Sequence, residues 1–184
     1  MPRKSIAFFI FAVIIFIARF AASSYADDVA EERLWISLDI FPRIVAVDMN
    51  LAKKVPQGSP LKLLLLYQSK KDLAVRAQKY LQKKITNISG FPVEISVSQQ
   101  PNCADYGAIM VTEKLDDVTF NKALSCAVDK GIILFSPNEE DVPRGATASV
   151  LIKIKVEPYF NKTTLAKSHL MINQMVLKFS NVYE

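Results

Sequence analysis

Histidine, cysteine and glycine are scarce in this chain of 184 residues. It has one histidine (His169), two cysteines (Cys103 and Cys126) and five glycines. A four-ligand zinc site of the usual cysteine and histidine type needs more of these side chains than one chain supplies. The glycines are scattered, so neither of the common glycine-rich phosphate-binding patterns is present. We therefore expect no bound metal and no cofactor.

The familiar catalytic motifs are also missing. The chain has no GxSxG elbow and no HExxH pair. A single histidine without a motif around it is more often structural or exposed than a general base. A hydrolase that works with carboxylates alone, such as Glu113 or Asp116, remains one alternative. Because the sequence contains no recognisable assembled site, we predict a non-enzymatic protein without catalytic residues.

Apolar residues, in contrast, are abundant at the N-terminus. Residues 1–26 contain five of the eleven phenylalanines, three basic residues and no acidic residue. Arg3 and Lys4 precede a run of thirteen uncharged residues, and a Ser-Tyr-Ala sequence then offers small side chains for cleavage near Ala26. This order is typical of a secretory signal peptide. We expect the segment to be removed and residues 27–184 to form a single domain in the periplasm.

A membrane anchor is the alternative interpretation of the same segment. A membrane span needs about 20 apolar residues, and Arg19 interrupts the run. We therefore expect a chain that does not span the membrane after cleavage. The leader carries three positive charges, so the net charge of +5 falls to +2 without it. A charge this small gives no reason to expect nucleic acid as a partner.

The two cysteines are expected to form a disulfide, because oxidising compartments favour pairing. Cys103 lies at the start of an expected strand (Tyr106–Thr112), and Cys126 lies near the end of the helix that follows. In a right-handed crossover that helix runs back towards the edge where its strand began. The two residues can then approach the Cα separation of roughly 5.5 Å that a disulfide requires. Two free, partly buried thiols are the alternative.

Apolar periodicity divides the rest of the chain into alternating helices and strands. Helical spacing is present over about 27–54, with a break or bend at Pro42, over Lys70–Ile85, and from Asp116 or Asp117 to Gly131. Short apolar or alternating runs predict strands at Leu61–Tyr67, Val93–Val97, Tyr106–Thr112, Ile132–Phe135 and Ala148–Val156. A short helix near Thr163–Lys167 and a terminal helix from about Asn173 complete the pattern.

This order predicts the fold class. Buried strands that alternate with helices favour a mostly parallel sheet covered on both faces. Apolar residues alternate with lysines in Ala148–Val156, which is typical of an edge or antiparallel strand. We predict an α/β fold of three layers, in which a mostly parallel sheet has helices on both faces and an antiparallel C-terminal portion.

Two groups of acidic residues are candidate binding sites. Glu113, Asp116 and Asp117 follow a strand at its carboxyl end, where open α/β sheets commonly bind ligands, but helix capping is the interpretation that we prefer. A second group could hold a hard cation but lacks the spaced oxygen ligands and the glycine of a calcium loop, which favours a solvated turn. Its members are Glu139, Glu140 and Asp141.

The order of features resembles the YfiR-like family of periplasmic repressors. The similarity covers most of residues 27–184. It rests on the apolar first helix (Trp35 to Val47), the strand Leu61–Tyr67 and the cysteine before a buried strand (Cys103 to Val111). It rests most specifically on a C-terminal run of Ile152-Lys153-Ile154-Lys155-Val156, then Asn161, Leu165, Ser168, Leu170, Ile172 and Val176-Leu177-Lys178-Phe179.

The resemblance implies an α/β fold with disulfides and a tendency to dimerise. Members of the family repress an inner-membrane diguanylate cyclase by binding its periplasmic sensor region, and an outer-membrane lipoprotein can sequester them. Only Cys103 matches a cysteine position of the family. The chain lacks the family's second cysteine pair, so the redox tuning known in the family does not carry over.

We therefore expect an exported regulatory or binding protein that acts by protein–protein contact. The expected partner is an envelope signalling protein, such as one controlling cyclic-di-GMP and biofilm formation. The expected contact residues, which would equally serve a homodimer, are Phe41, Ile44, Phe160, Leu170, Ile172 and Met175. The alternative function is a periplasmic receptor module that binds a small ligand at the carboxyl edge of the sheet.

Overall fold

The computed structural model describes the chain from residue 27 to its end, apart from residues 102 and 104. The expected signal peptide, residues 1–26, lies outside the described residues. Within the described part, no helix combines the length and the apolar character that crossing a membrane requires.

The chain divides into two compact units, residues 1–32 and residues 33–184. The described residues of the first unit are helical, and the second unit begins with a helix of residues 33–46. The second unit contains the sheet, the disulfide and both candidate sites.

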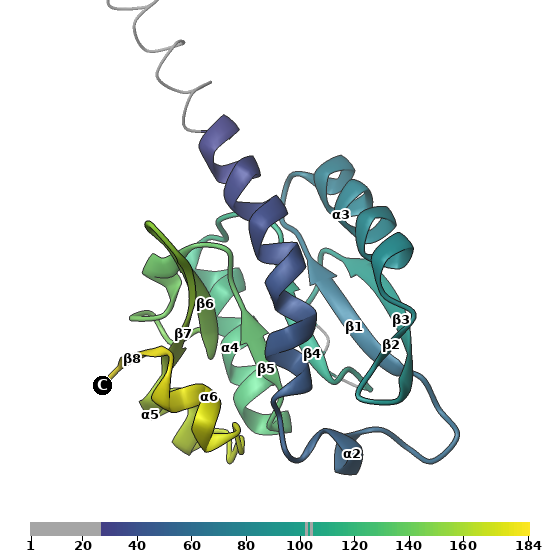
Figure 1. Cartoon of the computed structure of the whole chain (residues 1–184). Coiled ribbons are helices and arrows are strands. Elements are labelled where there is room, and N and C mark those ends of the chain that lie inside the picture. The colour runs from purple at the N-terminus through teal and green to yellow at the C-terminus, as the bar shows by residue number, and fades with distance from the viewer. Residues whose placement is uncertain (1–26, 102, 104) are drawn as a thin grey trace, which may run out of the picture. The chain divides into compact units, whose positions relative to one another are not determined.

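An eight-stranded sheet forms the centre of the second unit, in the order β2-β3-β1-β4-β5-β6-β7-β8 (Figure 1). The strands are β1 (Leu61–Leu66), β2 (Asn87–Ile88), β3 (Phe91–Ser98), β4 (Ala108–Val111), β5 (Ile133–Phe135), β6 (Ala148–Ile152), β7 (Val156–Asn161) and β8 (Asn181–Tyr183). The five strands from β3 to β6 in this order are parallel. β2 and β7 pair antiparallel with β3 and β6, and β8 is parallel to β7.

Helices cover both faces of this sheet. After the first helix they are α2 (Leu51–Lys54), α3 (Lys71–Lys84), α4 (Asp117–Lys130), the 3-10 turn η1 (Glu139–Asp141), α5 (Lys162–Lys167) and α6 (Gln174–Lys178). Alternation along β1 divides the core: Leu63 and Leu65 pack with the first helix and α3, whereas Leu64 and Leu66 pack with α4. The predicted three-layer α/β fold, with its antiparallel C-terminal portion, is confirmed.

The strand order reverses direction between β1 and β4. Helix α3 follows β1 and packs on one face of the sheet, while α4 follows β4 and packs on the other. In open α/β sheets such a reversal leaves a crevice at the carboxyl ends of the two strands, and ligands commonly bind there. A binding site is therefore expected at the loops after β1 and β4.

The predicted disulfide is present. Cys103 and Cys126 are bonded, with their Cα atoms 5.8 Å apart. Cys103 is buried in the cluster under α4, so the bond fastens the connection from β3 to β4 onto that helix. The geometric argument from the right-handed crossover was correct, and the bond is consistent with an oxidising compartment.

The first helix does not break at Pro42. It continues to residue 46, and the chain turns only afterwards, where Asp48 forms an isolated bridge with Ile172. Proline in a helix interior costs about 3 kcal/mol. Leu38 and Phe41, both fully buried against the sheet, show that tertiary packing outweighs this cost.

The C-terminal third departs most from the sequence prediction. Residues 148–156 are not one strand, because β6 ends at Ile152 and the chain turns at residues 153–155 into β7. Ile154, fully exposed at this turn, lies between two lysines. The expected terminal helix is only the short α6, and the chain ends in the strand β8, which the sequence did not indicate.

Candidate functional site

The crevice between β1 and β4 is occupied by a carboxylate of the chain itself. Glu113, just after β4, accepts hydrogen bonds from the backbone amides of Gln68, Ser69 and Lys70 at 2.8, 2.7 and 2.7 Å. The Ser69 hydroxyl donates to the same carboxylate at 2.6 Å. These amides lead into α3, whose own N-cap residue provides no side-chain cap. Glu113 therefore satisfies the backbone donors of the loop that leads from β1 into α3, up to the N-cap residue Lys70.

The hydrogen bonds stabilise Glu113 as an anion. Burial raises its pKa, but the Ser69 hydroxyl and the amides of Lys70, Ser69 and Gln68 together lower it by more. The pKa consequently lies below the usual glutamate value. The side chain thus serves as a fixed negative charge at the place where an anionic ligand would bind in a related sheet.

Replacing Glu113 by alanine is expected to lower the free energy of unfolding by about 1–2 kcal/mol at neutral pH, since it removes charged hydrogen bonds in a partly exposed site. The pKa of the folded state is lowered, so the contribution is complete above the unfolded pKa. It is lost as the pH falls through the folded pKa. Urea unfolding at several pH values measures both effects.

Lys114, the exposed neighbour of Glu113, provides the control. Lys114→Ala is expected to change the free energy of unfolding by less than about 0.5 kcal/mol. If acidification lowered the free energy of unfolding of wild-type protein and of Glu113→Ala by the same amount, the ionised Glu113 carboxylate would not stabilise the fold.

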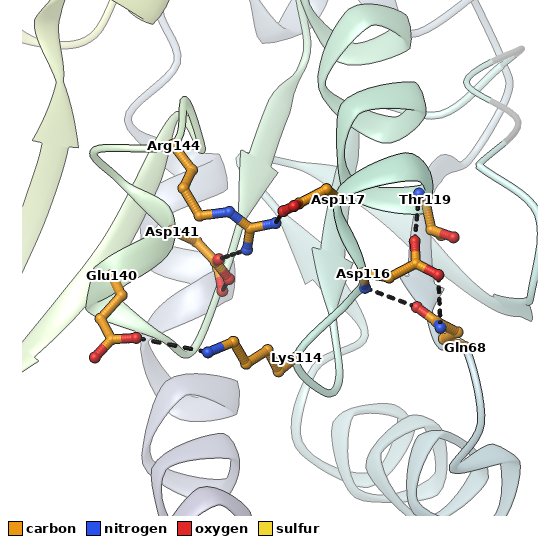
Figure 2. Close-up of polar contacts among 9 residues, drawn as sticks. Gln68, Lys114, Asp116, Asp117, Thr119, Glu140, Asp141 and Arg144 are labelled. Atoms are coloured by element: carbon orange, nitrogen blue, oxygen red, sulfur yellow. Dashed lines mark hydrogen bonds and ion pairs between the residues drawn. The ribbon is translucent and has the colours of Figure 1, made fainter.

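Asp116 caps α4, as one of the two sequence interpretations predicted. Its carboxylate accepts from the Thr119 amide at 2.7 Å and from the Gln68 side-chain amide at 2.9 Å (Figure 2). The Asp116 amide donates back to the Gln68 carbonyl oxygen Oε1 at 2.9 Å. The bonds from Thr119 lower the pKa of Asp116. Gln68 therefore joins the loop after β1 to the start of α4.

Arg144 links two further acidic residues of this edge, Asp117 and Asp141. Figure 2 shows its guanidinium between Asp117 and Asp141, with a hydrogen bond of 2.7 Å to Asp117 and another to Asp141. The guanidinium also lies 4.2 Å from the centre of the Phe120 ring. Asp141 is buried and accepts from the Ser136 hydroxyl at 2.5 Å.

The acidic turn does not gather its carboxylates into one site. Glu139 pairs with Arg33 at 3.4 Å, Glu140 pairs with Lys114 at 3.8 Å, and Asp141 bonds to Arg144. Three carboxylates with three different partners have no common point at which to hold a cation. Among the described residues, no group of three or more histidine, cysteine, aspartate or glutamate side chains is placed to bind a metal.

A cavity of about 390 Å³ lies between the loops that follow β4 and β5. Its lining consists of Lys114, Leu115, Asp116, Asp117, Asn138, Glu140, Asp141 and Arg144. Both cations of this lining are paired with carboxylates of the chain. The geometry therefore gives the acidic residues of the carboxyl edge capping and bracing roles. His169, the single histidine of the sequence, is exposed after α5 and is not part of this cavity.

A second candidate site lies at the opposite edge of the sheet. β7 is antiparallel to β6, so its end at Asn161 lies beside the start of β6, and α5, α6 and β8 follow from there. These elements border a groove of about 660 Å³, called here the C-terminal groove. Its lining consists of Met49, Lys162, Leu165, Ala166, Leu170, Met171, Ile172, Gln174, Leu177, Val182 and Glu184.

Exposed methionines form part of this apolar surface. Met49 and Met171 are 62% and 52% exposed, and their backbones are joined by an amide-to-carbonyl hydrogen bond of 2.8 Å. Met175, on α6, is 62% exposed, and Phe179 just after that helix is exposed as well. Exposed apolar residues that adjoin one groove indicate an interaction surface, whereas scattered ones do not.

The expected contact residues divide between core and surface. Phe41 and Ile44 on the first helix and Phe160 on β7 are buried in the core cluster, so they hold the fold together and are not offered to a partner. Leu170 and Ile172 form part of the groove wall, although little of either is exposed. Met175 is on the surface beside the groove.

Sequence reasoning missed Met49, Leu177 and Val182 as members of one surface. They come from the turn after the first helix, from α6 and from β8. Periodicity within any one segment carries no signal for this, because a long-range contact brings the segments together: the bridge between Asp48 and Ile172. Met49, an apolar residue in the turn after the first helix, was a local signal for an exposed apolar surface.

No protein-family model matches this chain, and no curated protein matches it either. Among solved structures, it is similar to the ABC domain from Streptococcus pneumonia in complex with L-Trp, with 16% identity and a TM-score of 0.46. It is also similar to a conserved domain protein from Vibrio cholerae O1 biovar eltor, with 15% identity and a TM-score of 0.49. Each similarity covers 76% of this chain and 60% of the other. Similarities this weak carry no information on what this chain binds.

Proposed function

We propose that this chain is a non-enzymatic binding module whose C-terminal groove receives a segment of another protein. The observation that carries the proposal is the contrast between the two edges of the sheet. At the carboxyl edge, Glu113 fills the crevice and Arg144 is held by two carboxylates. At the other edge, Met49 and Met171 line an apolar groove and remain more than half exposed.

The open edge of the sheet favours an extended segment as the occupant. β8 is the last strand in the sheet order, so its outer side is paired with no strand of the described chain. Val182 in this strand and Glu184, which directly follows it, both line the groove. A segment that adds a strand to β8 would make backbone hydrogen bonds at the edge and place alternate side chains over the groove.

Charge indicates what should flank the apolar part of that segment. Residues 161–184 contain Lys162, Lys167 and Lys178 but only one acidic residue, Glu184, which pairs with Lys162 at 2.7 Å. This part of the chain thus has a net charge of +2 with histidine neutral. Complementary charge speeds encounter and disfavours wrong partners. We assign to the groove an extended, apolar segment with acidic flanks.

The identity of the partner rests on the resemblance to YfiR-like proteins. It makes the partner the periplasmic region of an envelope signalling protein, with repression of a diguanylate cyclase as the outcome. The disulfide between Cys103 and Cys126 agrees with an oxidising compartment, and the periplasm is the compartment we propose. A homodimer through the same groove is the competing occupant.

A small-ligand receptor is the second candidate function. The observation that favours it is the 390 Å³ cavity between the loops after β4 and β5, at the edge where such sheets commonly bind ligands. A ligand there would have to displace the pairs that Arg144 makes with Asp117 and Asp141. This cost is why we place the receptor function second.

A charged substitution in the groove separates these candidates. The probe is a fluorescent peptide of alternating valine and threonine with glutamates at both ends, and its affinity is measured by anisotropy. Leu177→Asp is expected to weaken binding roughly tenfold or more, since a carboxylate in an apolar contact loses its hydration. A proline inserted in the peptide is expected to weaken binding too, because it removes an edge hydrogen bond.

Val118→Asp is the matched control. Val118 is an exposed apolar residue on α4, beside the carboxyl-edge cavity and away from the groove, and this variant should bind the peptide as wild type does. Absence of binding to wild-type protein, or equal binding by Leu177→Asp, would contradict the proposal. A loss confined to Val118→Asp would point to the carboxyl edge instead. If wild-type protein forms dimers and Leu177→Asp does not, the occupant of the groove is a second copy of the chain.

A further inference from the structure

The sulfur atoms of this protein that an oxidant can reach belong to methionines. Both cysteines of the chain are consumed in the disulfide, so no thiol is free. Met49, Met171 and Met175 are exposed, whereas Met110 in β4 is fully buried. An oxidant that attacks sulfur therefore meets thioethers at the surface.

Two of these methionines line the C-terminal groove, and the third lies on a helix that borders it. Met49 and Met171 line the C-terminal groove and are joined through their backbones. Met175 lies on α6, and two other residues of this helix, Gln174 and Leu177, line the groove. The exposed sulfur of the described chain is thus concentrated where the partner is proposed to bind.

We propose that Met49, Met171 and Met175 form an oxidation-sensitive site, and that their conversion to sulfoxides closes the C-terminal groove to its partner. This inference rests on the proposed function of the groove. The oxidant class is a peroxide, with hydrogen peroxide as the simplest member. The sulfur lone pair attacks one peroxide oxygen, the O–O bond breaks, and an S–O bond forms. Each thioether is oxidised by two electrons to a sulfoxide, and the peroxide is reduced and leaves as water.

The effect on binding follows from the polarity of the product. A sulfoxide is a polar hydrogen-bond acceptor, whereas the thioether is a flexible apolar group. Covering a sulfoxide with an apolar segment removes its hydration without supplying a donor. Three such groups around one groove oppose docking together, and reduction of the sulfoxides by a methionine sulfoxide reductase restores the surface.

Peroxide treatment of the full exported chain, followed by peptide mapping with mass spectrometry, tests the chemical part. Met49, Met171 and Met175 should gain one oxygen each well before Met110 does, because Met110 is buried. The disulfide should remain intact. Oxidation of Met110 as fast as the other three, with circular dichroism unchanged, would overturn the assignment of the site.

The same samples test the effect on binding. The acid-flanked valine and threonine peptide is the probe, and the measured quantity is the ratio of its affinity before and after peroxide treatment. Wild-type protein should bind at least fivefold more weakly after oxidation and recover after treatment with methionine sulfoxide reductases. In the variant M49L/M171L/M175L, which has no thioether at these positions, the ratio should stay near one.

The outcomes distinguish this inference from the function on which it rests. Peptide binding that is sensitive to Leu177→Asp but unchanged after full oxidation would overturn the oxidation switch and leave the groove function standing. Absence of peptide binding to untreated wild-type protein would overturn both. A loss of binding after peroxide that persists in the triple leucine variant would show that the sensitive group lies elsewhere, and would also overturn the switch.

Discussion

Replacing Asp141 by alanine is expected to lower the free energy of unfolding by about 3 kcal/mol. Asp141 is buried, and its two oxygens accept from the Ser136 hydroxyl and the Arg144 guanidinium. Removing one partner of a buried pair leaves the other groups without compensation, which typically costs about 3–5 kcal/mol. The lower value applies because Arg144 keeps its bond to Asp117 and is partly exposed. Urea denaturation at neutral pH measures the loss.

Glu140, the preceding residue, is the matched control. It carries the same charge in the same turn, but both it and its partner Lys114 are exposed. Glu140→Ala should therefore change the free energy of unfolding by no more than about 0.5 kcal/mol. Equal losses in the two variants would show that Asp141 does not brace the carboxyl edge, and would reopen that edge as a site for ligands.

Removing the disulfide is the second large effect. The double variant C103S/C126S is expected to lose roughly 3 kcal/mol, because the bond closes a loop of 23 residues that restricts the unfolded chain. The buried Cys103 also ties the connection before β4 to α4. The measurement is urea unfolding of wild-type protein and the double variant, each with and without a thiol reductant.

Reductant is the internal control for this prediction. It should lower the stability of wild-type protein to about the level of the double variant, and it should leave the double variant unchanged. A wild-type protein whose unfolding does not respond to reductant, under conditions in which mass spectrometry shows two free thiols, would contradict a stabilising role for the bond.

The central layers were predictable because local patterns and tertiary contacts agree there. The apolar run Leu61–Tyr67 became β1, and the amphipathic pattern of Lys70–Ile85 became α3. Asp116 and Gly131 mark the ends of α4 as predicted, with a side-chain cap at one and a left-handed conformation at the other. The predicted pairing of Cys103 with Cys126 followed from the expected oxidising compartment and from the right-handed crossover of strand and helix.

The C-terminal region was not predictable in the same way. The alternation of residues 148–156 continues through a turn, so the pattern alone cannot show where β6 ends. The strand β8 has three residues and exists because β7 provides a partner for it. Short strands of this kind depend on pairing, and pairing is a long-range contact that local composition does not report.

The candidate sites show the same division. The carboxylates at the end of β4 were found from the sequence, because their position follows from the alternation of strands and helices. The sequence left open whether Asp116 binds or caps, and the bond to Thr119 assigns it a capping role. The C-terminal groove was predicted only in part. Met175 was named as a surface residue, but Phe41 and Phe160 proved to be core because the first helix packs directly on the sheet.

Several apolar side chains at and near the C-terminal groove are exposed. Within the described residues, the exposed side chains of Met49 and Met171 line one groove, and exposed Met175 and Phe179 lie on or just after α6, which borders it. Single exposed apolar residues need no special explanation, but a group around a groove favours a docking surface. A methionine-rich docking surface can adapt its shape to its partner.

Photocrosslinking in intact cells tests the docking role of the C-terminal groove most directly. The full chain of 184 residues carries p-benzoylphenylalanine in place of Met175 or, as the control, in place of Val118. We predict a crosslink from position 175 to an extended, acid-flanked segment of an envelope protein, absent from position 118 and abolished by Leu177→Asp. No adduct from position 175, adducts from position 118 alone, or an adduct only to a second copy of the chain would contradict the account.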